Sequence, residues 1–125
     1  MEILGFCLTT ALEIIPKYNT GMIVLTREDY KHFRIQRGDT EGIVNYILKV
    51  RRLKVAALIS ERDGFVKLAL RSIGDFSVQE IATAHFGGGG HKNASGGFSK
   101  MSFRDTVNKF KDVLPSYKAQ LEDPY

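Results

Sequence analysis

The sequence predicts an α+β (α/β-like) fold, in which a mixed central β-sheet of about five strands is flanked by helices. The first observation behind this prediction is a hairpin pattern in residues 55–71, where two apolar runs are joined by Asp63-Gly64. The second is a set of segments whose apolar residues recur at spacings of three and four, as in helices: 3–15, 39–53, 78–85 and 103–114. A chain of 125 residues has the length of one domain and can bury a core without disulfides.

The first predicted element is a helix over residues 3–15, which Pro16 ends because the residue before a proline disfavours the helical region. This opening helix could dock on the domain, or it could be the tail of a part of the protein that was removed. Cys7 lies on its apolar face. As the single cysteine it excludes an internal disulfide, and we expect it to be a small buried hydrophobe.

Met22–Leu25 is a short apolar run that predicts a buried strand, and Thr26 follows as the N-cap of a helix with acidic residues in its first turn. A second helix is expected to begin near Asp39 or Thr40. The apolar positions that predict it are Ile43, Val44, Ile47, Leu48 and Leu53.

The hairpin is the clearest pattern in the chain, with strands at 55–60 and 65–71 and a turn at 61–64. Period-two alternation sets the residues of the second strand on two faces, with Val66, Leu68 and Leu70 on one and Phe65, Lys67, Ala69 and Arg71 on the other. Lys67 and Arg71 then point the same way, roughly 13 Å apart. We expect Lys67 on a solvated face, whereas Arg71 lies at a strand end, where functional residues are common.

After the hairpin, Ser77 and Glu80 predict a capping box at the start of a helix over 78–85. Residues 98–102 are expected to form a short strand. A final helix follows, with Phe103, Val107, Phe110 and Leu114 facing inward, and it ends at Pro115. The tail from Lys118 to Tyr125 is expected to be frayed.

The stretch Phe86–Gly97 holds six of the twelve glycines, and four of them are consecutive at 87–90. A backbone without Cβ atoms lets another molecule approach closely. Hydrogen-bond donors follow at once, and a helical turn over 91–95 would point free N–H groups at the loop, which predicts an anion site. The alternative is that the glycines allow the loop to pack tightly on the sheet, although four in a row exceed what packing usually needs.

Catalytic patterns are missing from the sequence. The glycines fit neither a phosphate-binding loop of the Gly-Lys-Ser/Thr kind nor a Gly-x-Ser-x-Gly nucleophile elbow. The three histidines, His32, His85 and His91, have no converging acidic residues, so we expect no metal site and no catalytic residue in this chain. His91 is the histidine placed to donate to a phosphate.

The net charge of +4 and a pI of about 9.3 allow a phosphate-bearing partner without requiring one. The apolar run at the N-terminus lacks a basic flank and contains Glu13, which argues against a signal peptide. No apolar stretch approaches the roughly 18 residues of a membrane span. We therefore expect a cytoplasmic location and no membrane partner.

The segment 86–96, with Gly87–Gly90 followed by His91 and Ala94, resembles the Gly-Gly-Gly-His-x-x-Ala signature of the DHH-associated C-terminal domain. That domain follows the catalytic domain of manganese-dependent DHH phosphoesterases. Residues 39–45 look like the family's Glu-Gly-x-x-Asn helix start, and 55–58 and 70–72 match its paired strands and arginine-serine ending. The resemblance covers about residues 20–114 and is closest to the oligoribonuclease subgroup that also removes phosphate from 3′-phosphoadenosine-5′-phosphate (pAp).

The resemblance implies two parts: residues 1–19 as a connector helix between domains, and 20–125 as a DHH-associated substrate-binding domain. The domain would bind the phosphate or terminal nucleotide of short single-stranded RNA or of a nucleotide. The residues implied for this role are Arg71, Ser72, Gly87, Gly88, Gly89, Gly90, His91 and Asn93, with Thr40, Glu41, Asn45 and Lys92 as weaker candidates.

The Asp-His-His triplet and the other metal-holding aspartates of the family are absent from this sequence. The resemblance therefore implies that manganese and catalysis belong to a DHH domain of the parent chain, and that this chain holds no cofactor. Two alternatives stay open. One is a general RNA-binding module such as the related domain of alanyl-tRNA synthetases, and the other is a structural or dimerisation domain, for which a homodimer is possible.

Overall fold

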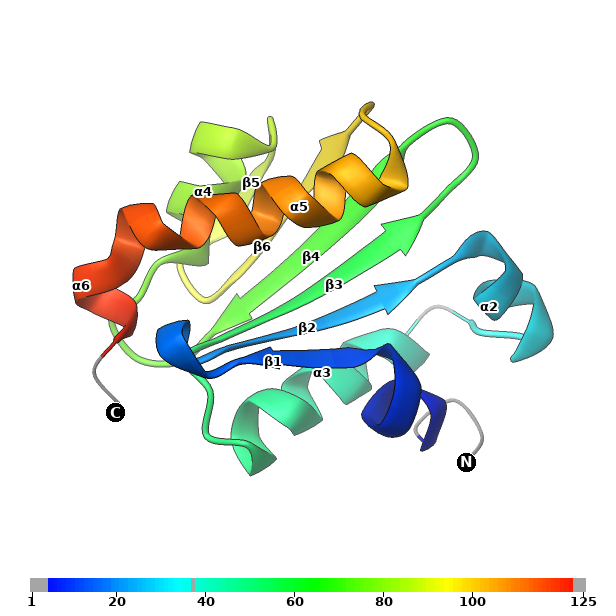
Figure 1. Ribbon diagram of the computed structural model, residues 1–125, viewed down its shortest axis with the longest axis horizontal. Helices are drawn as coiled ribbons and strands as arrows, with labels where there is room; N and C mark the ends of the chain where they lie inside the picture. Colours follow the sequence, from blue (N-terminus) through cyan, green and yellow to red (C-terminus); the bar gives the residue numbers. More distant parts are fainter. Residues whose placement is uncertain (1–4, 37, 123–125) are drawn as a thin grey trace.

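The computed structural model describes residues 5–36 and 38–122, and it contains a six-stranded sheet in the order β1-β2-β3-β4-β6-β5 (Figure 1). Its β2 and β3 run parallel, whereas the other neighbouring strands are antiparallel. The strands are β1 (Leu12–Ile15), β2 (Thr20–Leu25), β3 (Val55–Glu61), β4 (Val66–Ser72), β5 (Gly89–His91) and β6 (Ala94–Ser99). The predicted α+β class and the mixed sheet are confirmed, with six strands in place of about five.

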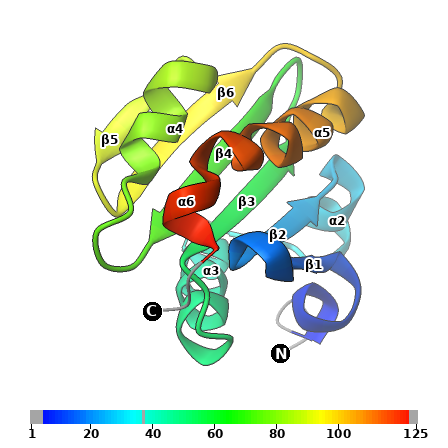
Figure 2. The ribbon, with the colours of Figure 1, turned by 60° about the vertical axis from the view of Figure 1, so that its left-hand side comes forward.

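Helices cover both faces of the sheet, which makes three layers (Figure 2). Helix α3 (Asp39–Val50) packs on one face, and α4 (Val78–His85), α5 (Phe103–Val113) and α6 (Lys118–Leu121) lie on the other. The shorter helical elements are η1 (Cys7–Ala11), η2 (Pro16–Tyr18), α2 (Arg27–His32) and η3 (Leu114–Tyr117). Among the described residues, no helix has the length and apolar character needed to cross a membrane.

The predicted hairpin is confirmed, with β3 and β4 paired from Val55–Ser72 to Glu61–Val66. Alternation places Val66, Leu68 and Leu70 in the core beneath α4 and α5, where all three are buried. The opposite face of β4 turns toward the side of α3. It leaves Lys67 exposed and Arg71 half-buried, so the hairpin presents both cations on one face, as the alternation predicted.

The opening segment differs from its prediction, because the helix does not extend to Ile15. The chain forms the short π-helix η1, and Leu12–Ile15 then becomes the edge strand β1, which pairs antiparallel with β2. A run of Leu-Glu-Ile-Ile satisfies helical spacing, but its β-branched residues also suit a strand, and β2 offers it an unpaired edge. The proposed domain boundary at residues 19 and 20 remains a prediction.

The glycine stretch also differs from its prediction. Residues 91–95 do not form a helical turn, because Gly89–His91 and Ala94–Ser99 are the two strands of a hairpin. The second of these strands therefore begins at Ala94 and not at Phe98. The cause is long-range pairing, since β6 lies along β4 and its glycines Gly96 and Gly97 stand opposite Ala69 and Leu68.

Two capped helix starts were predicted, and the structure confirms the cap of the first but not the capping box of the second. Thr26 caps α2 in a full capping box with Asp29, which is stronger than the predicted cap alone. Ser77 occupies the predicted N-cap of α4, but its side chain makes no capping hydrogen bond, so the expected box with Glu80 is wrong. The amide of Val78 instead donates to the backbone oxygen of Lys92 at 2.9 Å, and this bond replaces the cap.

The C-terminal segment is ordered beyond Pro115, contrary to the expected fraying from Lys118. It continues through η3 into α6, where Leu121 is fully buried. Asn19 Nδ2 donates to the carbonyl of Leu121 at 2.6 Å, and Lys54 Nζ donates to that of Gln120 at 2.7 Å. Residues 123–125 of the predicted tail lie outside the described part of the chain.

Cys7 is buried at 1% exposure, as predicted, and burial together with the negative charge of Asp29 raises the pKa of its thiol to about 11. Alkylation needs the thiolate, which is scarce below that pKa. We expect iodoacetamide to label Cys7 slowly in the native protein at pH 8 and quickly in denaturant, as measured by mass spectrometry. Rapid labelling of the native protein would show that η1 does not protect the thiol.

Candidate nucleotide-binding groove

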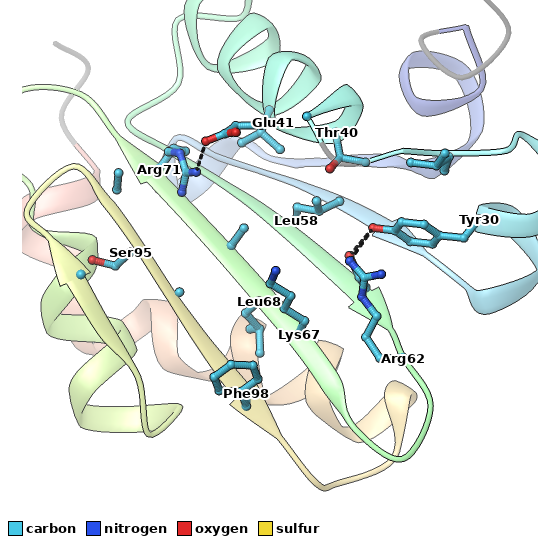
Figure 3. Close-up of a pocket in the computed structure, with 18 of the residues that line it drawn as sticks. Tyr30, Thr40, Glu41, Leu58, Arg62, Lys67, Leu68, Arg71, Ser95 and Phe98 are labelled. Carbon is cyan, nitrogen blue, oxygen red and sulfur yellow. Dashed lines mark hydrogen bonds and ion pairs between the residues drawn. The ribbon is translucent and has the colours of Figure 1, made fainter.

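A groove of about 830 Å³ lies on the face of the sheet that carries α3 (Figure 3). Residues of β3, β4 and β6 form its floor, and α2 and the first turns of α3 form one wall. The glycines of β5 close the other side. The groove therefore joins the predicted glycine stretch to the hairpin, although residues 73–85 separate the two in the chain.

Arg71 stands at one end of this groove, one residue before the end of β4. Its Nη1 donates to the backbone oxygen of Leu70 at 2.9 Å, and its Nη2 forms an ion pair of 3.1 Å with Glu41. The arginine side chain is 19% exposed, whereas that of Glu41 is 62% exposed. A guanidinium carries five donors, so these two bonds orient the group and leave donors for an anion in the groove.

His91 lies in the same row of the sheet as Arg71. In the strand register Arg71 is opposite Ala94, and Ala94 is opposite His91, so two strand spacings, roughly 10 Å, separate the two backbones. His91 is solvent-exposed on the edge strand and does not line the groove. A ligand that extends from Arg71 over β6 would pass toward His91. The role of His91 in binding stays a prediction.

Ser72 and Asn93, which were predicted to bind substrate, contact each other, and their role in binding stays a prediction. The buried Ser72 hydroxyl donates to the carbonyl of Phe76 at 2.7 Å and accepts from Asn93 Nδ2 at 2.9 Å. Asn93 also donates to the carbonyl of Gly74 at 3.2 Å. The pair thus fixes the β5-β6 turn to the turn after β4, outside the groove lining.

The first two glycines of the predicted loop have roles in the backbone. Gly87 follows the C-cap of α4 with a left-handed φ of +59°, and the amide of Gly88 donates to the carbonyl of Ala82 at 3.0 Å. A Cβ on Gly88 would lie 1.9 Å from the carbonyl oxygen of Gly96. Close packing therefore explains more of this stretch than expected, and the Gly88 amide is not free for a ligand. Gly89 and Gly90 do line the groove.

Of the four weaker candidates, two line the groove and two lie outside its lining. Thr40 and Glu41 line the groove from the first turn of α3. Asn45 is exposed on the same helix outside the groove lining, and Lys92 is exposed and pairs with Asp75 at 3.6 Å. Helix α3 thus contributes its N-terminal end to the site.

Several groove residues were missed by sequence reasoning, namely Tyr30, Ser60, Arg62, Phe65 and Phe98, together with Lys67, which was assigned to a plain solvated face. Three of the lining residues are basic and one, Glu41, is acidic. The alternation of β4 could have linked Lys67 to Arg71. The others depend on α2 lying beside the hairpin, which the sequence does not show.

The groove does not have the donor set of a metal centre. Within residues 5–36 and 38–122, no three His, Cys, Asp or Glu side chains come together as metal ligands. Its lining carries one carboxylate, and that carboxylate is paired with Arg71. The residues of the groove therefore do not fit manganese, and the groove is suited to an anionic ligand.

The fold and the groove define an α+β domain whose site is basic and, among the described residues, has no group of metal ligands. The family model described as the DHHA1 domain matches residues 15–122, and the chain belongs to this family. Among curated proteins, none matches the sequence.

Solved structures share this fold. An exopolyphosphatase-related protein from Bacteroides fragilis is 33% identical, with a TM-score of 0.89. The match covers 98% of this chain and 36% of the Bacteroides protein. The pGpG-specific phosphodiesterase PggH from Vibrio cholerae is 14% identical with a TM-score of 0.67, covering 94% and 39%. The C-Ala domain of alanyl-tRNA synthetase from Aquifex aeolicus is 12% identical with a TM-score of 0.56, covering 90% and 98%. The chain thus spans less than two-fifths of the first two proteins.

Proposed function

We propose that this chain is the substrate-binding domain of a DHH-family phosphoesterase, and that its groove holds the phosphate or terminal nucleotide of a short single-stranded substrate. The observation that carries the proposal is Arg71, a half-buried arginine oriented by Glu41 at one end of a groove in which basic side chains outnumber acidic ones. Arginine in such a position binds phosphate oxygens through charge-assisted hydrogen bonds.

The floor of the groove supports a nucleotide better than a bulky peptide or lipid. Between Arg71 and the far end it includes the small residues Ala69, Ala94 and Gly96, over which the sheet backbone lies close to a ligand. PggH, whose fold is similar, is described as specific for the dinucleotide pGpG. A short oligoribonucleotide or pAp, as the oligoribonuclease subgroup would use, is the substrate we propose here.

The proposed mechanism divides the work between two domains. Arg71 and the glycine strand would hold the substrate's end and fix its scissile phosphodiester in position, which contributes to rate by orientation. A DHH domain elsewhere in the parent protein would hold manganese, and that metal supplies activation of water. In this division the present chain is not catalytic by itself.

Titration of the ¹⁵N-labelled chain with pAp and with a diribonucleotide, followed by NMR, tests the proposal. We expect shifts that saturate for Arg71, Glu41, residues 89–90 and residues 94–96, because these line the groove, and no shifts on the opposite face, in α5. A titration to millimolar ligand without shifts in these residues would contradict substrate binding by this chain.

The similarity to the C-Ala domain favours a second candidate, a general RNA-binding module. Binding to long RNA depends on many phosphate contacts, so its affinity falls steeply with salt, by a slope of roughly −0.7 per contact for single strands. We expect a shallow slope, because the groove holds three basic residues. A steep slope with preference for long RNA would favour the second candidate over the first.

A further inference from the structure

The end of the groove opposite Arg71 contains a second group of cationic and aromatic side chains. Arg62 lies there against Tyr30, and Lys67 of β4 and Phe98 of β6 lie further across the sheet, as Figure 3 shows. The Arg62 guanidinium lies over the Tyr30 ring, 4.5 Å from its centroid, and the Tyr30 hydroxyl is 2.8 Å from Ser60 Oγ. Contacts from α2 and β3 therefore hold Arg62 in place before any ligand arrives.

Arg62 is incompletely satisfied in this position. Its Nη2 is 3.5 Å from the Tyr30 hydroxyl, which is a long hydrogen bond. Its Nε is buried, and among the described residues this atom has no hydrogen-bond partner. Buried donors without a partner are rare in folded proteins. An anion at this end of the groove would supply acceptors to the Arg62 guanidinium.

Lys67 and Phe98 stand directly opposite each other in the register of β4 and β6. Lys67 is exposed, and within the described chain its side chain has neither an ion pair nor a hydrogen bond. Phe98 is 55% exposed, and its ring lies 5.7 Å from that of Phe65, which is 37% exposed. An exposed aromatic ring beside an unpaired cation is the usual arrangement for stacking a base and neutralising its phosphate.

The distance between the two ends decides what kind of ligand can use both. Lys67 and Arg71 are on the same face of β4, four residues and roughly 13 Å apart. The small residues Ala69 and Gly96 lie between them on β4 and β6, with Leu58 of β3 opposite Ala69. A single phosphate cannot contact both cations across this span, whereas two successive nucleotides of a single strand can.

We propose that Phe98, Lys67 and Arg62 form a subsite for a second nucleotide, with the base on the Phe98 ring and the phosphate at the two cations. The first nucleotide's phosphate occupies the Arg71 end. This inference rests on the proposed function and makes it more specific, because the groove then prefers a dinucleotide or longer strand to a mononucleotide such as pAp.

The test measures the affinity of the chain for pAp and for a 5′-phosphorylated diribonucleotide, in the wild type and in Lys67→Ala and Phe98→Ala. Both changes are at exposed side chains, and Lys100→Ala and Tyr46→Ala are controls for charge and for an exposed aromatic. We expect each subsite variant to weaken dinucleotide binding by about tenfold, as loss of one stacked base or one phosphate contact does, with pAp binding nearly unchanged.

Salt dependence adds a second readout, since loss of the Lys67 contact lowers the slope of log affinity against log salt by about 0.7, whereas Phe98→Ala leaves it unchanged. Unchanged dinucleotide affinity in both variants, or equal losses for both ligands, would overturn the second subsite. Failure of the wild type to bind either ligand would contradict the proposed function itself, so the two failures are distinguishable.

Discussion

Replacing Arg71 by alanine is expected to weaken binding of both pAp and a dinucleotide by roughly 5- to 150-fold, the equivalent of about 1–3 kcal/mol for a lost charged hydrogen bond. The change also leaves Glu41 without its partner at 3.1 Å, so a carboxylate then faces the anion without a compensating charge. In the parent enzyme the loss is expected mainly as an increase in KM. Isothermal titration calorimetry on the chain and steady-state kinetics on the parent measure the two effects.

Arg104→Ala is the matched control for Arg71→Ala. It removes the same charge from an exposed position on α5, which lies on the opposite face of the sheet. We expect it to change affinity less than twofold at moderate salt, because exposed charges more than a Debye length away are screened. Equal losses in the two variants would show that net charge, and not the groove, determines binding.

Replacing Gly88 by alanine is expected to lower the free energy of unfolding by about 3 kcal/mol or more. This is the upper end of the loss that overpacking of a core usually causes. The added Cβ would lie 1.9 Å from the carbonyl oxygen of Gly96 and 2.7 Å from the Cα of Gly97. Both obstacles are backbone atoms of β6, which is paired with β4 and cannot move aside as a side chain would. Thermal unfolding followed by circular dichroism is expected to show a decrease in Tm of roughly 10 °C.

Gly42→Ala is the control for this change. Gly42 lies in α3 with no atom within 4 Å of the position of an added Cβ. Alanine at a helical position is expected to raise the unfolding free energy by roughly 0.5–1 kcal/mol. If Gly88→Ala unfolds at the same temperature as the wild type, the loop does not pack on β6 as described.

Local patterns predicted the parts of the fold in which neighbouring residues decide the structure. The β3-β4 hairpin followed from Asp63-Gly64 and from strict alternation, and α3 followed from its apolar spacing. Arg71 could be singled out because alternation and a strand end are both visible in the sequence. These signals depend on only a few neighbouring residues, so they can be recognised from one sequence alone.

Pairing between distant segments accounts for the predictions that were wrong. Residues 12–15 and 91–95 have ambiguous local patterns, and the free edges of β2 and β4 decide that both join the sheet. The far end of the groove was missed for the same reason, since Tyr30 and Arg62 meet only after α2 has packed beside the hairpin. No signal within either segment indicates the other.

The contact between Ser72 and Asn93 affects how a mutational survey of this domain should be interpreted. Ser72 follows Arg71 and Asn93 precedes Ala94, both of which line the groove, and bonds within the fold hold Ser72 and Asn93 outside its lining. Substitutions at either are expected to reduce activity by loosening two turns, with affinity and stability falling together. A survey scored by activity alone would count them as ligand contacts, whereas one that also records abundance would separate them from Arg71.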